Sequence, residues 1–421
     1  MDKSKLAPNL LQRLEAAGAE TLGMRAVAAI PIIIRYKPNV IRSQAVAENV
    51  WAQFVFKLTP TVATQTTGDL IADLTDRDEI EYIWLDEEIH TCLDQSVSHI
   101  GVPPVWNAGY RGTGIKVAIV DTGIDPNHPD FQGRIAAGAS FVGGSWVDEN
   151  GHGTHVAGIV AGSGSALGGR YRGVAPEALL YVARSLDKNG GGSMSTVMAG
   201  VEWAVEQGVQ VINLSLGGAG SSDGSDALSM TCNAAVARGI VVCVAAGNAG
   251  PTGRTVGSPG AAADVITVGA TDRADGIARF SSRGPTADGR IKPDICFPGT
   301  DIVSARAAGT GMGRPVSDLY TAASGTSMAT PHASGLAALL LQAQPGLTPQ
   351  QVKKALMDTA LNLGQDPNAQ GAGRAQAEHA YHAIRSGVPG ETPESPGGGS
   401  SDTPSQPKGC LPNFLIPLVG R

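Results

Sequence analysis

Apolar strands and helices alternate regularly between residues 179 and 249. Strand-like ALLYVARSL is followed by helical STVMAGVEWAVEQG, then by VQVINLSLGG, SDALSMTCNAAVARG and IVVCVAAGN. Gly208 and Gly239 stand where helices are expected to end, and an apolar β-branched strand follows each of them at once. This βαβ rhythm predicts an α/β fold with a doubly wound, mainly parallel sheet.

The chain divides into three units by composition and pattern. Residues 1–93 hold three strand patterns, IPIIIRYKP, AQFVFKLTP and EYIWLDEEIHTCL, and one helical pattern, GDLIADLTDRDEI, which predict a small α/β domain. Residues 94–385 begin with a turn-rich segment and contain the strand–helix alternation. Residues 386–421 are rich in Pro, Gly and Ser, and we expect them to be disordered.

Composition excludes several classes of function. Charged residues make up only 16% of the 421 residues and the net charge is −7, so there is no basic field for nucleic acid or an anionic membrane. No apolar run reaches transmembrane length. The polar N-terminal stretch lacks the apolar core of a secretory signal, which favours a cytoplasmic protein, with secretion as the alternative if a leader is missing.

The cysteines give no sign of a metal centre. There are 5 of them, with no CxxC and no Cys/His spacing typical of zinc. Cys243 lies within the apolar strand IVVCVAAG, where a small buried thiol is expected in preference to a disulfide with Cys232.

Ser327 is a candidate nucleophile. It opens the helical segment GTSMATPHASGLAALLLQAQP, whose first backbone N–H groups and dipole would face a reacting oxyanion. Taken alone, the same serine is better explained as a helix N-cap, which is what most serines before helices are. Asp121 ends the buried strand IKVAIVD and is expected at the carboxyl edge of the sheet, where open α/β folds bind ligands.

Two histidines in DENGHGTHVAGIVAG allow two interpretations. His152 and His155 would lie one turn apart on a helix that follows a tight turn. With a carboxylate they could bind zinc in a metallohydrolase, although the glutamate of a helical HExxH motif is absent. Alternatively, one histidine is catalytic and the other is packed in the core.

Four motifs together resemble the subtilases, the subtilisin-like serine peptidases. They are DTGID at Asp121, NGHGTHVAG at His152, AAGN at Asn248 and GTSMATP at Ser327, in the order of that family. The resemblance implies that Ser327 is the nucleophile, that His152 is its general base and that Asp121 orients the imidazole. It also implies that Asn248 and the backbone N–H of Ser327 bind the oxyanion, and that His155 is structural.

The same resemblance implies a substrate peptide bound as an extra strand between two edges of the site. The edges are Gly190, Gly191 and Gly192 on one side and Ser215, Leu216 and Gly217 on the other. Small residues at 215–217 and 245–247 predict a pocket for a large apolar side chain on the acyl side of the cleaved bond. Met194 is expected to line a more remote pocket.

Residues 1–93 resemble the inhibitory propeptide of subtilases, which implies autoprocessing of a zymogen near the Leu93–Asp94 bond. We expect the protein to be a monomer. Its expected partners are protein or peptide substrates and its own propeptide, which acts as an inhibitor. The chemistry needs no cofactor. Gln95 and Asp130 match positions that hold a structural calcium in relatives, but the loop GSGSALGGRYRG lacks the expected asparagines and carries two arginines, which argues against that site.

Two alternatives to a serine endopeptidase remain at this point. One is the metallohydrolase built on His152 and His155. The other is a catalytically inactive peptide-binding module, against which the presence of Asp121, His152, Asn248 and Ser327 argues.

Overall fold

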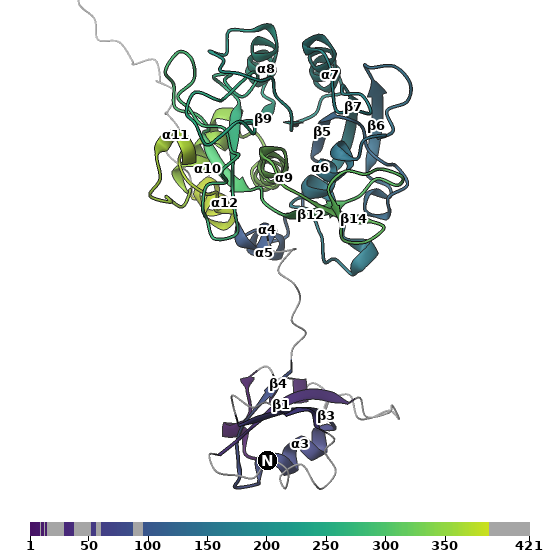
Figure 1. The fold of residues 1–421 in the computed structure, drawn as a ribbon, viewed down its shortest axis with the longest axis vertical. Coiled ribbons are helices and arrows are strands. Elements are labelled where there is room, and N and C mark those ends of the chain that lie inside the picture. Colours follow the sequence, from purple (N-terminus) through teal and green to yellow (C-terminus); the bar gives the residue numbers. More distant parts are fainter. Residues whose placement is uncertain are drawn as a thin grey trace, which may run out of the picture. The chain divides into compact units, whose positions relative to one another are not determined.

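The computed structural model divides into two compact units, residues Met1–Cys92 and Leu93–Arg421 (Figure 1). The residues it describes are 1–8, 10, 11, 13, 14, 29–37, 52–55, 60–86 and 96–386. The predicted disordered tail lies outside these residues apart from Ser386, as do Cys92, Leu93, Asp94 and Gln95.

The first unit is a four-stranded antiparallel sheet with strand order β2-β3-β1-β4. Its elements are η1 (Lys3–Lys5), β1 (Ile30–Tyr36), β2 (Ala52–Val55), β3 (Thr61–Thr66), α3 (Gly68–Thr75) and β4 (Ile80–Leu85). Alternate residues of β1, including Ile32 and Ile34, are fully buried together with Ile71 of α3. The small α/β architecture is confirmed, but β3 was not predicted because its sequence TVATQT has no apolar run.

The second unit is built on seven parallel strands in the order β11-β10-β9-β8-β5-β7-β6. These strands are β5 (Lys116–Asp121), β6 (Ile135–Ser140), β7 (Leu179–Arg184), β8 (Val211–Leu214), β9 (Val241–Ala245), β10 (Ile266–Thr271) and β11 (Ile295–Pro298). Strands β6 and β7 lie on one side of β5, and β8 to β11 follow on the other. The predicted doubly wound parallel sheet is confirmed. All of its strands run in the same direction, and the order in which they are added along the sheet reverses at β5.

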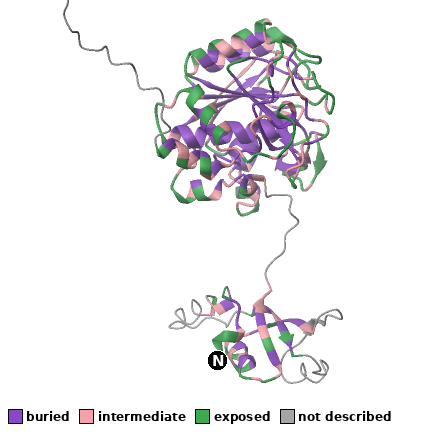
Figure 2. Cartoon of the chain, turned by 90° about the vertical axis from the view of Figure 1, so that its left-hand side faces the viewer, coloured by how far each residue is buried: buried purple, intermediate pink, exposed green. Residues whose placement is uncertain are grey.

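Helices cover both faces of this sheet. The helices of this unit are α4 (Ser96–His99), α5 (Pro103–Asn107), α6 (His152–Ala161), α7 (Met194–Glu206), α8 (Ala227–Ala237), α9 (Thr326–Ala343), α10 (Pro349–Asp358), α11 (Pro367–Gln370) and α12 (Ala377–Arg385). In β5, Val117 and Ile119 join the core formed with α6 and α9, while Ala118 and Val120 join the core formed with α7 and α8. The period of two along the strand therefore serves two buried faces. Figure 2 shows the buried strands of this unit lying between helices.

Two predicted helix ends are confirmed by backbone geometry. Gly208 and Gly239 have φ angles of +64° and +86°, the left-handed conformation that terminates a helix. Cys232 and Cys243 are both buried and free, so no disulfide joins them. None of the helices in the described part of the chain is both long and apolar enough to cross a membrane.

A small antiparallel sheet completes the unit with strand order β12-β14-β13. Its strands are β12 (Ile302–Ala305), β13 (Arg314–Pro315) and β14 (Tyr320–Ala323), and short 3-10 turns occur at η2 (Pro129–Phe131) and η3 (Ser165–Leu167). These strands and the edge strand β6 were not predicted, because each is short or rich in alanine and serine.

Candidate active site

The predicted site residues meet at the carboxyl edge of the parallel sheet. Asp121 is the last residue of β5, His152 the first of α6, Asn248 follows β9, and Ser327 is in the first turn of α9. Three of them, His152, Asn248 and Ser327, line one cleft of about 790 Å³. Asp121 lies beneath that cleft and is fully buried.

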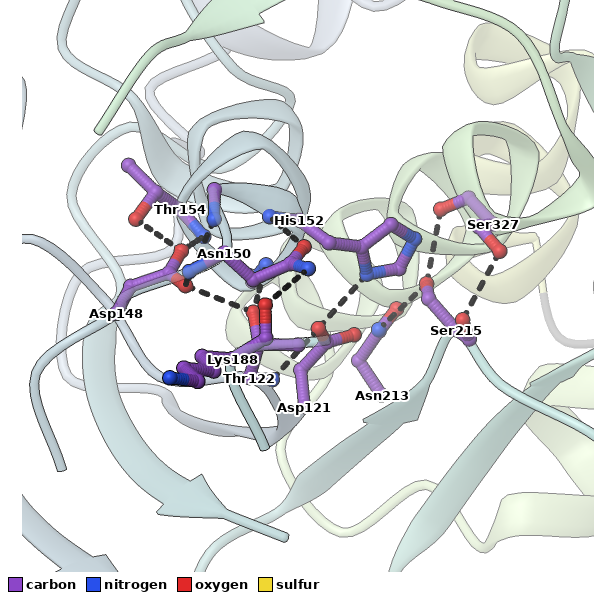
Figure 3. A network of polar contacts seen from close by, with 12 residues as sticks. Asp121, Thr122, Asp148, Asn150, His152, Thr154, Lys188, Asn213, Ser215 and Ser327 are labelled. Carbon is purple, nitrogen blue, oxygen red and sulfur yellow. Dashed lines mark hydrogen bonds and ion pairs between the residues drawn. The ribbon is translucent and has the colours of Figure 1, made fainter. Parts of the chain in front are cut away.

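Asp121 and His152 form a direct hydrogen bond. The Nδ1 atom of His152 lies 2.7 Å from Oδ1 of Asp121, which also accepts a bond of 2.7 Å from the backbone N–H of Thr122. A carboxylate partner requires the imidazole proton on Nδ1, so Nε2 keeps its lone pair and can act as a base. Figure 3 shows the imidazole between Asp121 and Ser327.

The surroundings of His152 make it a stronger base. Burial alone would lower the pKa of His152, but the charge of Asp121, the hydrogen bond to it and the charge of Asp148 together raise that pKa above its ordinary value. The imidazolium formed when His152 takes a proton is therefore stabilised by two carboxylates.

The hydroxyl of Ser327 forms its hydrogen bond with Ser215 and not with His152. Its Oγ donates to the carbonyl oxygen of Ser215 at 2.9 Å, and the Oγ of Ser215 donates back to the carbonyl of Ser327 at 2.9 Å (Figure 3). Asn213 of β8 supports this exchange by donating to Ser215 Oγ at 2.9 Å. The hydroxyl must rotate to reach His152, a step typical of catalytic bonds that tighten only when substrate is bound.

Asn248 presents its amide N–H₂ to the cleft. Its Oδ1 accepts bonds from the backbone N–H and from Oγ1 of Thr326, at 2.9 and 3.0 Å. These two bonds fix the amide plane, and no described residue accepts a hydrogen bond from Nδ2. The first N–H groups of α9, Ser327 among them, have no acceptor within the helix. The two residues expected to bind an oxyanion thus line one cleft.

His155 is a core residue. Its side chain is fully buried, and Nε2 lies 3.1 Å from the carbonyl oxygens of both Ile302 and Thr321. Burial and the nearby charge of His152 lower the pKa of His155 to about 3, so its ring is neutral. Among the residues that the structure describes, no three His, Cys, Asp or Glu side chains are placed to hold a metal ion together, so His152 and His155 have no carboxylate that completes the metal site considered above.

The predicted substrate-binding edges line the same cleft. Its walls contain Gly190, Gly191, Gly192, Ser215, Leu216 and Gly217, and Met194 lies at its margin. Among the lining residues His152 is the only titratable one, and the rest are small, apolar or hydroxyl-bearing, or carry an amide at Asn150, Asn189 and Asn248. The cleft can therefore accept a peptide backbone along both edges without a charge that selects Lys or Arg side chains.

Comparison with known proteins agrees with this geometry. The sequence model described as "Subtilase family" matches residues 112–373. The chain belongs to the subtilase family. It is similar to the serine protease AprX of Bacillus subtilis (strain 168), at 41% identity over 344 residues that cover 75% of this chain and 78% of AprX. It is also similar to subtilisin E of the same organism, at 38% identity over 317 residues covering 73% and 77% of the two chains.

A solved structure shares the fold of this subtilase. A cold adapted subtilisin-like serine proteinase matches with a TM-score of 0.52 and 35% identity, covering 63% of this chain and 88% of that one. This subtilase is thus a subtilisin-like serine protease that acts on protein substrates. The predicted enzyme class is confirmed, and the metallohydrolase and inactive-module alternatives are wrong.

Sequence reasoning missed the contacts of three residues that hold the site together. Thr326 orients Asn248, Ser215 holds the serine hydroxyl, and Asp148 bonds the turn before His152. Thr326 stands inside a motif that was singled out, but nothing in the sequence indicated its partner. Such pairings join residues far apart in the chain and become visible only in the folded subtilase.

Proposed function

We propose that this subtilase cleaves peptide bonds through an acyl-enzyme on Ser327, with His152 as general base and acid and Asp121 as its orienting acid. The observation that carries the proposal is the 2.7 Å bond between Asp121 and His152 Nδ1, which leaves Nε2 as the only basic nitrogen of an imidazole that lies beside Ser327. A serine hydroxyl is a weak nucleophile and needs such a base.

The chemistry follows from these positions. His152 Nε2 takes the proton from Ser327 Oγ as that oxygen bonds to the scissile carbonyl carbon. The carbonyl oxygen becomes an oxyanion bonded by Asn248 Nδ2 and the N–H of Ser327. When the C–N bond breaks, Nε2 returns the proton to the leaving amine, and water then repeats the sequence to release the acid. The charge on His152 is balanced by Asp121 throughout.

The proposed specificity is for a large apolar residue on the acyl side of the cleaved bond. The state of Asp226, an acid close to the cleft wall, supports this specificity. Asp226 accepts a hydrogen bond of 2.6 Å from Oγ of Ser258, which lines the cleft. Asp226 does not line the cleft, and its oxygens also accept bonds from Ser222 and Ser229. That carboxylate is therefore saturated by protein donors and is not offered to a Lys or Arg of the substrate.

Mass spectrometry of peptides released from a denatured protein mixture tests both activity and specificity. We expect most cuts to follow large apolar residues, because their burial in an uncharged pocket is favourable. Ala249 in the cleft wall offers a matched pair: Ala249→Glu is expected to add cuts after Lys and Arg, whereas the isosteric Ala249→Gln is not. Dominant cleavage after basic residues by the unaltered protein would contradict the assignment.

We further propose that the unit Met1–Cys92 is an inhibitory propeptide that the subtilase removes itself. The division of the chain into compact units falls at Cys92 and Leu93, beside the bond expected to be cut. A small sheet domain with its own buried core is suited to fold and act as a separate body after cleavage.

We also propose that the position of Asp130 is stabilised without calcium, because its surroundings do not fit a cation site. Tyr320 donates its hydroxyl to Oδ2 of Asp130 at 2.9 Å, and Ser163 donates to Oδ1 at 3.3 Å. Burial and the adjacent carboxylate raise the pKa of Tyr320, so the phenol keeps its proton. The carbonyl oxygens nearby accept bonds from Arg134, which reaches Asp130, Ala161 and Pro176.

The expected result is a thermal unfolding midpoint that a chelator leaves unchanged and that Tyr320→Phe lowers. Losing the hydroxyl donor to a buried carboxylate costs about 1.5–3 kcal/mol. Tyr171, whose ring centroid lies 4.7 Å from that of Tyr320, provides the control: Tyr171→Phe removes a hydroxyl that does not bond to Asp130 and should change the midpoint less. Measurements in a Ser327→Ala background avoid autolysis. A midpoint that falls on chelation and recovers with calcium would contradict the proposal.

A further inference from the structure

A second buried carboxylate, Asp148, lies behind the active site and is not part of the proposed triad. It is 5% exposed and belongs to the turn that precedes α6. Figure 3 shows its carboxylate directed toward Thr154 and Asn150, at the first turn of that helix.

The Asp148 carboxylate bonds the elements that carry Asp121 and His152 to one another. Its Oδ1 accepts bonds of 2.9 Å from the hydroxyl of Thr122 and from the backbone N–H groups of Asn150 and Gly151. Its Oδ2 accepts from the N–H and the hydroxyl of Thr154, at 2.9 and 2.6 Å. Thr122 follows Asp121 directly, and the other donors flank His152.

Thr122, directly after β5, completes this hydrogen-bond network. While it donates to Asp148, its Oγ1 accepts the N–H of Gly153 at 2.9 Å. A Cβ on Gly153 would lie 2.1 Å from the carbonyl oxygen of Gly123. The first turn of α6 is therefore pressed against the loop after β5 at a distance that only glycine permits.

The segment that carries Asp148 is itself fixed to the sheet. The backbone N–H of Asp148 donates to the carbonyl of Ile124 at 3.2 Å. Arg184, the last residue of β7 and 5% exposed, donates to the carbonyls of Ser145 and Val147 at 2.8 and 3.1 Å and pairs with Glu149. Since Arg184 is the register partner of Asp121, the Asp148 segment is held against the strand end that carries the triad acid.

We propose that Asp148 is a positioning residue for catalysis, which sets the place of His152 relative to Asp121 and Ser327 through Thr122 and the first turn of α6. The inference rests on the proposed function, because it assumes that His152 is the base. Asp148 touches neither substrate nor the reacting atoms.

Asp148 also acts on His152 through its charge. The charges of Asp121 on β5 and of Asp148 in the preceding turn act on the imidazole of His152. His152 in turn acts on His155 of α6, which is neutral. Asp121 and Asp148 both raise the pKa of His152, so neutralising Asp148 lowers that pKa. The acid limb of the kcat/KM profile, which reports the free base, must then move to lower pH.

Asp148→Asn separates position from charge when it is compared with Thr122→Val. An asparagine amide replaces one oxygen by N–H₂, so at least one backbone N–H at Asn150, Gly151 or Thr154 loses its acceptor and the turn must shift. We expect kcat to fall by about 10²-fold, the usual cost of a misplacement near 1 Å, with KM little changed. The acid limb should move to lower pH. Thr122→Val should also lower kcat but leave the acid limb in place, because the charge remains, and Thr122→Ser should restore kcat.

Asp125 supplies a matched control. It is likewise buried, and its carboxylate accepts the N–H groups of Asn127 and Ala308 instead of those beside His152. Asp125→Asn therefore repeats the chemical change without touching the turn, and should leave both kcat and the acid limb near their original values. Thermal unfolding of each full-length variant shows whether it is folded.

Two results would overturn the inference. One is a folded Asp148→Asn enzyme with the kcat and acid limb of Asp125→Asn. The other, which decides even if Asp148→Asn does not fold, is a Thr122→Val enzyme with unaltered kcat. Failure of the proposed function would be seen separately from failure of this inference. Proteolytic activity in Ser327→Ala would contradict the proposed function, whatever the variants of Asp148 do.

Discussion

Ser327→Ala is expected to lower kcat for peptide hydrolysis by about 10⁶-fold while the protein stays folded, the size of loss known for the nucleophile of subtilisin, a relative of this enzyme. Alanine removes the attacking oxygen but leaves the cleft, Asn248 and His152 in place. The side chain is half-buried and, among the residues that the structure describes, its hydroxyl bonds only to the carbonyl of Ser215, so folding has little dependence on it. Initial rates on a casein substrate and on a short peptide measure the effect.

The same variant tests the zymogen proposal. If the subtilase removes residues 1–93 itself, active wild-type protein begins close to Asp94, whereas Ser327→Ala accumulates as the full-length chain. His152→Ala serves as the control, because it lacks the base but keeps the serine and should also remain uncut. N-terminal sequencing gives the answer. An uncut N-terminus in fully active wild type, or normal cleavage of Ser327→Ala without added protease, contradicts autoprocessing.

Asn248→Leu is expected to lower kcat by about 10²–10³-fold with little change in KM, the range found for one oxyanion donor in subtilisin. Leucine has similar volume but no N–H₂ to bond the charge that develops on the carbonyl oxygen. Because this charge is absent from the ground state, substrate binding should be preserved. Steady-state kinetics on one peptide substrate separates the two constants.

Thr326→Val provides the comparison for Asn248→Leu. It removes one of the two bonds that orient the Asn248 amide and leaves the donor itself, so we expect a smaller loss of kcat. A well-folded Asn248→Leu enzyme with nearly unchanged kcat would show that Nδ2 does not bind the oxyanion. A loss confined to KM would assign Asn248 to substrate binding instead.

The main sheet and the placing of the site could be predicted because their signals are local. The apolar strand before Asp121 and the glycines at 208 and 239 indicate strand ends and helix ends by themselves. Parallel strands bring their carboxyl ends to one edge, so Asp121 was expected at that edge, whereas Asn248 was assigned through the resemblance of its AAGN motif.

The remainder depends on contacts between distant segments. Strand β3 is polar by sequence and becomes a strand through its pairing with β1 and β2. Asp148 could not be distinguished from an ordinary turn acid, because the hydroxyl of Thr122 that it accepts lies 26 residues earlier. The bond from Ser327 to the carbonyl of Ser215 likewise joins the residue after β8 to the start of α9, across 112 residues.

Reaction with a serine-directed phosphonylating reagent tests the assignment of Asp121, His152 and Ser327 most directly. The wild-type protein should gain the mass of one phosphonyl group, and peptide mapping should place it on Ser327. His152→Ala should react far more slowly, because the hydroxyl has lost its base, and a chelator should leave the reaction unchanged. A stable adduct on another residue, or full proteolytic activity after complete modification of Ser327, would contradict the assignment.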